Sequence, residues 1–258
     1  MAEIYNLTLP PELQKGPWQL LEKGLSGASV FKGVFVERDC YLKITPHAHR
    51  MAVKAEYEHL KWLQGRIPVP EILAYVEDEA RQYLVTAAVD GIDAFEFDAK
   101  PDDIIRLYAK AIRRLHDLPT ADCPFTWTPD EQIAFARKSV QNNQVNDDNR
   151  DEAFKERSWE SMLEELIRLR PNDADLVMVH GDAYNDNMLL NPSSGELAAF
   201  IDVGFVAVAD RYTDLAMIYD DVVDYYGIEG WQAFLKHYGS TDVEPQRFRF
   251  YQLLNEFI

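Results

Sequence analysis

One segment constrains this chain more than any other, because short apolar runs alternate in it with polar loops. The run Leu176–Val179 leads into His180-Gly-Asp-Ala-Tyr-Asn-Asp-Asn187, and the next run, Met188–Leu190, leads into a turn. A third apolar run then ends in Asp202-Val-Gly204. Short apolar runs bounded by turn residues predict buried strands, so we expect the polar residues on loops between strands.

These polar residues have the order and spacing of a kinase catalytic loop followed by its metal-binding aspartate. Phosphoryl transfer requires an aligned hydroxyl and neutralisation of negative charge on the phosphates. Asp182 is placed to take the hydroxyl proton, whereas Asn187 and Asp202 offer a neutral and a charged oxygen to Mg²⁺. Each residue alone is read more simply as part of a turn or strand end, but the three together favour a kinase.

A kinase also needs a cation at the donor phosphates. Lys43 lies in the strand-like run Tyr41-Leu-Lys-Ile44, and Glu56 follows on an expected helix. This is the pairing of strand lysine and helix glutamate that positions the α- and β-phosphates in kinases. Glu58 is a local competitor for the role of Glu56.

The pattern changes near residue 91, where paired strands give way mainly to helices. We therefore predict an α+β chain with a small β-rich N-terminal lobe, residues 1–90, and a larger, mainly helical C-terminal lobe, residues 91–258. The expected elements are strands within 33–44, a helix over 50–64, strands at 71–76 and 82–89, a helix from Pro101, a loop at 141–151 and a helix over 156–169.

The composition narrows the function classes. Lys and Arg number 26 against 44 Asp and Glu, a formal charge of −18, which argues against nucleic acid or an anionic membrane as partner. No run approaches the roughly 18 apolar residues of a membrane-spanning helix. The N-terminus has no signal-peptide pattern and the two cysteines form no CxxC pair, so we expect a cytoplasmic protein.

In these motifs the chain resembles the aminoglycoside phosphotransferase family, most closely its 3′-hydroxyl kinases. The resemblance implies a protein-kinase-like fold, ATP (or GTP) as phosphoryl donor, Mg²⁺ as cofactor and a cationic aminoglycoside as acceptor. It is carried by Gly24-Leu-Ser-Gly-Ala-Ser-Val-Phe31, Tyr41-Leu-Lys43, Val179-His-Gly-Asp182, Phe200-Ile-Asp-Val-Gly204, Val208-Ala-Asp-Arg-Tyr-Thr-Asp-Leu-Ala216 and the closing Tyr251-Gln-Leu-Leu-Asn-Glu-Phe-Ile258.

The resemblance also implies a role for individual residues. Asp182 would be the catalytic base, Asn187 and Asp202 the magnesium ligands, and Lys43 with Glu56 the phosphate-positioning pair. For the rest of the nucleotide it implies Ser26 near the β-phosphate, Tyr41 stacked on adenine, and the backbone of Ala87 and Val89 bonded to the base.

The family's substrate pocket is acidic, and the resemblance implies carboxylates from three segments of this chain. Residues 1–90 hold 12 acidic and 10 basic side chains, so nearly all of the negative charge lies in residues 91–258, which suits a polycation. The implied substrate-binding residues are Asp148, Asp151, Asp224, Glu256 and the carboxylate of Ile258, with Asp147 and Asp220 as further candidates.

The chain departs from the family pattern at three places. Phe205 stands where an arginine is usual, Asn255 where the 3′ enzymes have aspartate, and Ile258 where they end in an aromatic residue. These departures bear on substrate range. We also expect His116 to be structural or a partner of its helix dipole, and Arg211 to brace Asp210 or Asp214.

Two other functions are kept open. A kinase of another small alcohol (a macrolide, choline or a homoserine-like compound) would share the catalytic loop but leave the carboxylates without partners. A nucleotide-binding module without turnover would not need the intact set of Asp182, Asn187, Asp202 and Lys43. The sequence leaves the oligomeric state open, with a monomer favoured.

Overall fold

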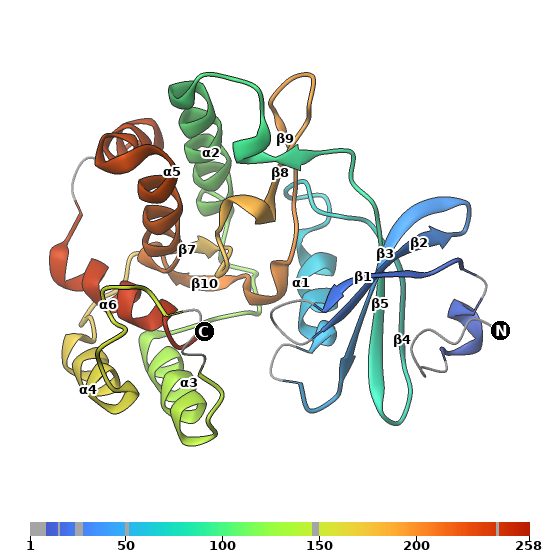
Figure 1. Ribbon diagram of the computed structural model, residues 1–258, viewed down its shortest axis with the longest axis horizontal. Helices are drawn as coiled ribbons and strands as arrows, with labels where there is room; N and C mark the ends of the chain where they lie inside the picture. Colours follow the sequence, from blue (N-terminus) through green and yellow to red (C-terminus); the bar gives the residue numbers. More distant parts are fainter. Residues whose placement is uncertain (1–8, 15, 24–27, 50–51, 146–149, 241–242) are drawn as a thin grey trace. The chain divides into compact units, whose positions relative to one another are not determined.

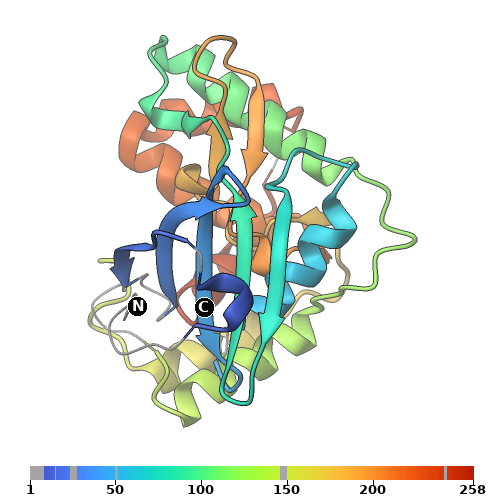
Figure 2. The ribbon, with the colours of Figure 1, turned by 90° about the vertical axis from the view of Figure 1, so that its right-hand side faces the viewer.

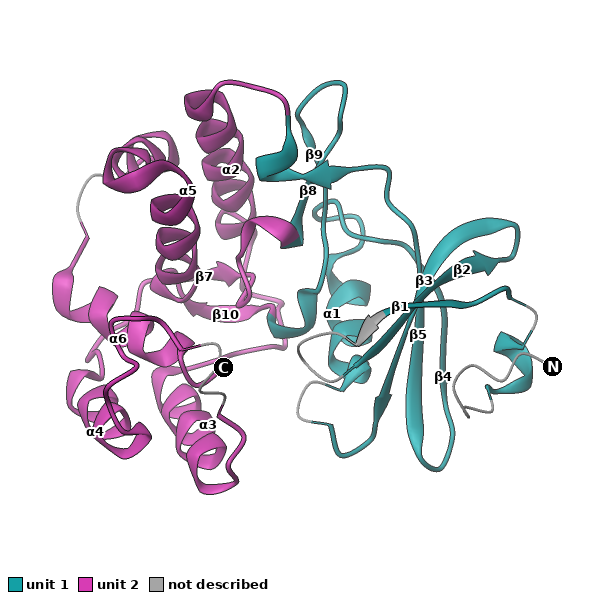
Figure 3. Ribbon diagram, in the orientation of Figure 1, with its two compact units in different colours: residues 1–97, 187–205 teal, residues 98–186, 206–258 magenta. Residues whose placement is uncertain are grey.

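The computed structural model describes residues 9–14, 16–23, 28–49, 52–145, 150–240 and 243–258. The chain forms two compact units, coloured separately in Figure 3: residues 1–97 with 187–205, and residues 98–186 with 206–258. We call them unit 1 and unit 2 and describe each by itself.

Unit 1 is built on a five-stranded antiparallel sheet, whose strands lie side by side in Figure 2. Its order is β1-β2-β3-β5-β4, where β1 is Gln19–Lys23, β2 Ser29–Phe35, β3 Arg38–Pro46, β4 Ile72–Glu77 and β5 Arg81–Ala87. β2 and β3 join through Val36 and Glu37, both with positive φ (51° and 60°). The tight turn between the two strands therefore consists of Val36 and Glu37.

Side chains along β3 point alternately into the core of unit 1 and to the opposite face of the sheet. Cys40, Leu42 and Ile44 are buried in a cluster with Phe31 and Val85. Because successive residues of a strand face opposite sides of a sheet, Tyr41 and Lys43 share the other face.

Helix α1, Val53–Leu63, is tied to the sheet at its first turn. The Val53 N–H donates to Thr45 Oγ1 at 3.1 Å, and the Lys54 N–H donates to Gln82 Oε1 at 3.1 Å. These side chains of β3 and β5 satisfy two of the amides that a helix N-terminus leaves unpaired. They also fix where Glu56, one turn further on, meets the sheet.

A second sheet explains why residues 187–205 group with the N-terminal part. β8, Met188–Leu190, pairs with β9, Leu197–Phe200, on one side and with β6, Ile92–Asp93, on the other. At Gly91 a Cβ would lie 2.8 Å from the Leu189 Cβ, so only glycine permits this approach. The grouping differs from a single boundary near residue 91, because this pairing is long-range and leaves no local signal in the sequence.

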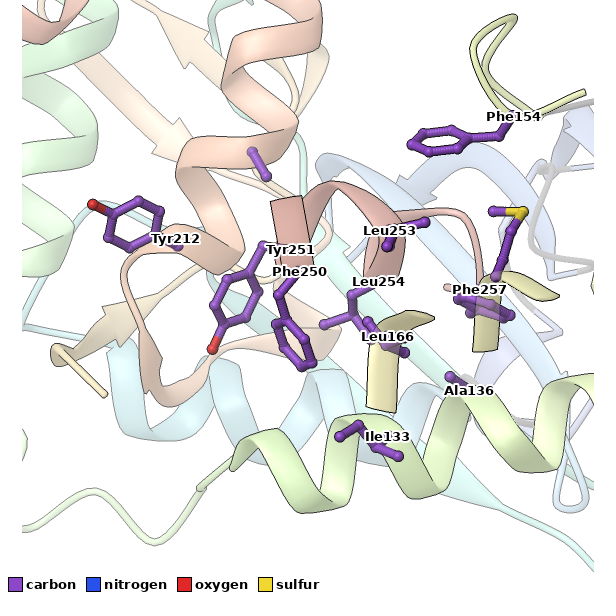
Figure 4. Packing of buried hydrophobic residues seen from close by; sticks show 12 residues of the cluster. Ile133, Ala136, Phe154, Leu166, Tyr212, Phe250, Tyr251, Leu253, Leu254 and Phe257 are labelled. Atoms are coloured by element: carbon purple, nitrogen blue, oxygen red, sulfur yellow. The ribbon is translucent and has the colours of Figure 1, made fainter. Parts of the chain in front are cut away.

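Unit 2 is mainly helical. Its helices are α2 Pro101–His116, α3 Pro129–Gln141, α4 Trp159–Leu169, α5 Tyr212–Tyr238 and α6 Pro245–Asn255; the strands β7, Leu176–Val179, and β10, Ala207–Asp210, pair antiparallel. Buried apolar side chains of α3, α4 and α6, joined by Phe154 and Phe257, form the cluster shown in Figure 4. Short 3₁₀ turns complete the chain at Pro11–Leu13, Ala94–Glu96, Asn185–Asn187 and Val203–Phe205.

Figure 1 draws helix α5 as two segments. The break between them lies at Gly227. Gly227 has φ 68° and ψ −176°, a backbone conformation that is open essentially to glycine alone. The break redirects the second segment, so that Tyr238 at its end returns to the residues at the start of the helix.

The structure confirms the predicted α+β class and most predicted elements. The helix expected over 50–64 is Val53–Leu63, that expected from Pro101 is Pro101–His116, and the strand at 176–179 is found as expected. No helix within the described residues is both long and apolar enough to cross a membrane.

Candidate active site

Lys43 lies at the centre of the polar group in unit 1. Its Nζ is 2.9 Å from Glu56 Oε1 and 3.0 Å from Oε2, and it also forms an ion pair with Asp202. Glu58 pairs with Lys61 instead, at 3.2 Å. The predicted partnership of Lys43 with Glu56 is therefore present, and the competitor has a different partner.

The two carboxylates keep this lysine charged. Burial alone would lower the pKa of Lys43, but Glu56 and Asp202 together raise it above the ordinary value of 10.5. The Lys43 side chain is 19% exposed, so an anionic ligand can reach it.

Asn187 and Asp202 lie at the same end of the β8–β9 pair. Met188 pairs with Phe200 in the antiparallel register, so the residue before β8 and the residues after β9 are neighbours. The Ile201 N–H donates to the Asn187 carbonyl at 3.0 Å, which joins the two segments next to Asp202.

The backbone of Asp202 is held in an unusual conformation. Its φ is 54°, a region that aspartate tolerates better than most residues, and the Val203 carbonyl is bonded to His59 Nδ1 at 2.9 Å. Ordered partners on both sides of Asp202 therefore maintain a positive φ in a residue whose carboxylate is half exposed.

The oxygen donors of Asn187 and Asp202 fit a magnesium ion that is shared with phosphates. Mg²⁺ keeps several waters or phosphate oxygens and takes few protein ligands. Among the described residues there is no cluster of three or more His, Cys, Asp or Glu side chains able to hold a metal. An amide and a carboxylate are ligands that suit an ion arriving with a nucleotide.

The other nucleotide residues implied by the sequence are only partly placed. Tyr41 shares its sheet face with Lys43, but the Ala87 N–H already donates to the Glu71 carbonyl at 2.9 Å. The Ala87 N–H is therefore not available to a base. Ser26 lies outside the described residues.

In unit 2, Asp182 is carried by a loop whose backbone is anchored on both sides. Before it, the His180 and Gly181 N–H groups each donate to Asp214 at 2.8 Å. Gly181 has φ 78°, which explains the glycine of this motif. After it, the Asn185 N–H donates to Asp221 at 2.6 Å.

Both anchoring carboxylates come from α5. Asp214 and Asp221 are seven positions apart, about two helical turns, and so lie on the same side of the helix. The hydroxyl of Tyr108, from α2, also donates to the Ala183 carbonyl. The position of Asp182 is therefore set by helices and not by a free loop.

Asp220 has three further carboxylates of the acidic cluster near it: Asp151, Asp224 and Glu256. The Asp151 N–H donates to Glu256 Oε2 at 3.1 Å. Burial and the neighbouring charges of Asp151 and Glu256 raise the pKa of Asp220 from 3.8 to about 7. Burial also raises the pKa of Glu256 from 4.5 to about 7, with Asp151 adding to the rise. The negative charge of these carboxylates is only partly balanced by nearby cations, which favours a cationic partner.

Tyr184 links the acidic cluster to the catalytic loop. Its pKa is raised above the ordinary value by burial and then by the charges of Asp220, Asp182, Asp221 and Glu256. The same phenol therefore lies near both the candidate base and two members of the cluster.

The remaining substrate residues are placed as follows. Asp147 and Asp148 lie outside the described residues. Ile258 packs its side chain against the core cluster, and its N–H donates to the Asn255 carbonyl at 3.3 Å. The Asn255 amide is buried and has no hydrogen-bond partner among the described residues.

The prediction for Arg211 is wrong. Its Nε lies 2.6 Å from Asp175 Oδ2 and its Nη1 donates to Tyr238, whereas Asp214 is taken by the catalytic-loop backbone and by His116. The sequence pairing rested on nearness along the chain, but the break at Gly227 brings Tyr238 to this place instead. His116 is buried and structural, as expected.

Comparison with known proteins agrees with this geometry. The model of the phosphotransferase enzyme family matches residues 17–251. The chain is 34% identical to an aminoglycoside 3′-phosphotransferase of Streptomyces fradiae, over 93% of this chain and 94% of the relative.

Solved structures are similar as well. An aminoglycoside-3′-phosphotransferase of type VIII superposes with a TM-score of 0.85 at 34% identity, with 94% of each chain covered. The aminoglycoside phosphotransferase APH(3'')-Id from Streptomyces rimosus, in complex with ADP and streptomycin, superposes with a TM-score of 0.82 at 29% identity, covering 93% of this chain and 92% of that one.

Proposed function

Because the chain belongs to the phosphotransferase enzyme family, with a protein-kinase-like fold, we propose that it is an ATP-dependent kinase that phosphorylates a cationic aminoglycoside at its 3′-hydroxyl. Its relative from Streptomyces fradiae, which it matches along nearly the whole chain, is an aminoglycoside 3′-phosphotransferase. The structure that holds ADP and streptomycin supports a nucleotide donor and an aminoglycoside acceptor.

One observation carries the choice of acceptor. Tyr184 lies near the candidate base, Asp182, and near Asp220 and Glu256, so the reacting group and the acidic cluster belong to one region of unit 2. The raised pKa values of Asp220 and Glu256 indicate that these carboxylates have too few cations near them. A polycation bound there would supply ammonium groups as their partners. A neutral alcohol such as a macrolide would leave these carboxylates without partners.

Unit 1 supports the donor half of the reaction. The Lys43 ammonium, held by Glu56, would bind the oxygens of the α- and β-phosphates. Tyr41 would stack on adenine, and the Ala87 carbonyl and Val89 N–H would bond its edge. Asp202 and Asn187 would hold Mg²⁺, which when bound neutralises charge on the β- and γ-phosphates.

Unit 2 supports the acceptor half. The acceptor oxygen forms a bond to the γ-phosphorus while the bond from that phosphorus to the β–γ bridging oxygen breaks, releasing ADP. The hydroxyl proton passes to the carboxylate of Asp182. Since Asp214 and Asp221 fix the backbone on either side of Asp182, the base is oriented before the substrate arrives. We also infer a cytoplasmic enzyme that acts as a monomer.

A coupled ADP-release assay with Mg-ATP tests this function. The acceptors are kanamycin, neomycin, a 3′-deoxy aminoglycoside, streptomycin, a macrolide and choline. We expect turnover of kanamycin and neomycin and none of the 3′-deoxy compound. Turnover of streptomycin alone would show that the enzyme phosphorylates a hydroxyl other than the 3′-hydroxyl. Turnover of the macrolide or choline alone would support a kinase but reject an aminoglycoside as its acceptor.

A further inference from the structure

We propose that Tyr238 is a positioning residue for phosphoryl transfer, because its hydroxyl holds the ring of His116 so that the Nε2–H donates to Asp214 and keeps it beneath the backbone that carries Asp182. The inference rests on the proposed role of Asp182 as base. It assigns a function to a buried polar chain that lies behind the catalytic loop.

The inner end of this chain is Asp214, which is fully buried. Its Oδ1 accepts from the Gly181 N–H and its Oδ2 from the His180 N–H, both at 2.8 Å. His116 Nε2 lies 2.9 Å from the same Oδ2. A buried carboxylate needs donors for its charge, so the proton on His116 Nε2 matters for its stability.

The outer end fixes the direction of the hydrogen bonds. Arg211 can only donate, and its Nη1 lies 3.0 Å from the Tyr238 hydroxyl oxygen, which must therefore accept. The hydroxyl proton then points to His116 Nδ1, 2.7 Å away. With Nδ1 as acceptor, neutral His116 carries its proton on Nε2 and donates it to Asp214.

Arg211 itself is held in place by Asp175, through Nε at 2.6 Å and Nη2 at 2.9 Å. The chain of donors therefore runs in one direction, from Arg211 through Tyr238 and His116 to Asp214. This is the arrangement of neutral His116 that gives each of these buried groups a partner of the right kind.

Loss of the Tyr238 hydroxyl would leave His116 Nδ1 buried without a donor. The Asp214 carboxylate can only accept and keeps the proton on Nε2, so the ring would have to shift to find a new partner for Nδ1, which would weaken its bond to Asp214. A less firmly held carboxylate would move and, with it, the amides of residues 180–181 next to the base. A displaced base reduces catalysis more than binding, because alignment matters most in the transition state.

Tyr238→Phe is the first test, because the ring packing can remain. The ring meets His116 edge-on at 5.6 Å and stacks on Phe234 at 6.0 Å. We expect kcat to fall about fivefold or more, the value of one ordinary hydrogen bond, with KM for ATP and for kanamycin little changed.

Tyr212→Phe is the matched control. Tyr212 is also a tyrosine of α5 with a bonded hydroxyl, which accepts from the Glu244 N–H at 2.9 Å. It should lower stability without lowering kcat. If Tyr238→Phe behaves in the same way, the role of Tyr238 is only structural and the proposal is overturned.

A second pair of variants separates the two ring nitrogens of His116. His116→Gln places an amide N–H near the position of Nε2 and can still donate to Asp214, whereas His116→Asn places its amide near Nδ1. We expect the glutamine variant to retain more of kcat than the asparagine variant. Equal or reversed activities contradict the proposal.

Nitrogen-15 NMR of the histidine rings gives a readout apart from turnover. Wild-type His116 should show an acceptor-type Nδ1 and a protonated Nε2, and Tyr238→Phe should shift the resonances of both nitrogens as the bond to Asp214 weakens. An unchanged Nε2 resonance in Tyr238→Phe overturns the proposal even if kcat falls. Failure of the proposed function would look different, since the wild type itself would then release no ADP with kanamycin, whereas turnover retained by Asp182→Asn would reject only the role of Asp182.

Discussion

Arg211 and Tyr238 stand at opposite ends of helix α5 in the sequence, yet the Arg211 Nη1 donates to the Tyr238 hydroxyl at 3.0 Å. A straight helix of this length would separate them by about 40 Å, at 1.5 Å per residue. The break at Gly227 makes the contact possible. The buried chain behind the catalytic loop therefore depends on the backbone of one glycine far along the sequence.

Replacement of Gly227 should destabilise the protein. The positive φ with an extended ψ suits glycine alone, so Gly227→Ala should lower the free energy of unfolding by about 1–3 kcal/mol. Space is not the reason, because no atom lies within 4 Å of a Cβ built there. Urea unfolding followed by circular dichroism measures the change.

Gly239 provides the matched control. It also has a positive φ and open space, but its ψ of 26° is the ordinary left-handed conformation that asparagine tolerates. Gly239→Asn should therefore cost much less than Gly227→Asn. Equal losses at the two glycines would show that backbone conformation is not the cause.

Removal of the Lys43 ammonium should impair the donor half of the reaction. Lys43→Ala is expected to lower kcat/KM for ATP by about 10²–10³-fold, since a preorganised charge is lost and Glu56 is left without its cation. Initial rates at varied ATP measure the change. Lys54→Ala is the control, because that lysine is exposed and lies 3.6 Å from Glu77. Normal ATP kinetics in Lys43→Ala would show that Lys43 does not take part in binding the nucleotide.

Asp182→Asn tests the assigned base. The amide keeps the shape of the side chain but cannot take a proton, so kcat should fall by about 10²–10⁴-fold. Binding of ADP, measured by calorimetry, should remain unchanged because Lys43 and Asp202 are intact. Asp186→Asn, an exposed neighbour on the same 3₁₀ turn as Asn187, is the control. Near-normal turnover of Asp182→Asn would reject the role.

The fold was most predictable where local pattern and burial agree. The strand Leu176–Val179 and the helix that starts at Pro101 are found as expected, because their signals lie within a few residues. Helix α3 was missed, although Thr128 and Glu131 form a capping box that could have revealed its start.

In the candidate site, the pairing of charged side chains was more predictable than the contacts that support the loops. Lys43 and Glu56 follow from spacing, because one strand and the next helix hold them. Asp214 and Asp221 were not identified as supports of the catalytic loop, since their partners are backbone amides 34 and 36 residues earlier. No local signal in the sequence marks such a contact, although their seven-residue spacing on one helix does place them on one face.

The acidic cluster should make stability depend on pH in a defined direction. Asp220 and Glu256 have pKa values of about 7 in the folded protein, above their ordinary values of 3.8 and 4.5. The folded state therefore keeps protons that the unfolded chain releases. The stability associated with these groups is fully present below about pH 4 and is lost as the pH rises to about 7.

Asp220→Asn removes the most affected group and its repulsion of Glu256. Compared with the wild type, this variant should gain stability at pH 8 and lose that advantage at pH 5, as measured by thermal unfolding at both values. Asp224→Asn, on the exposed side of the same helix, should gain less. Saturating kanamycin should stabilise the wild type more than Asp220→Asn at pH 8, because its ammonium groups pair with the ionised carboxylates. Parallel pH curves for wild type and Asp220→Asn would show that this cluster is already neutralised without a substrate, and would remove the electrostatic argument for a cationic acceptor.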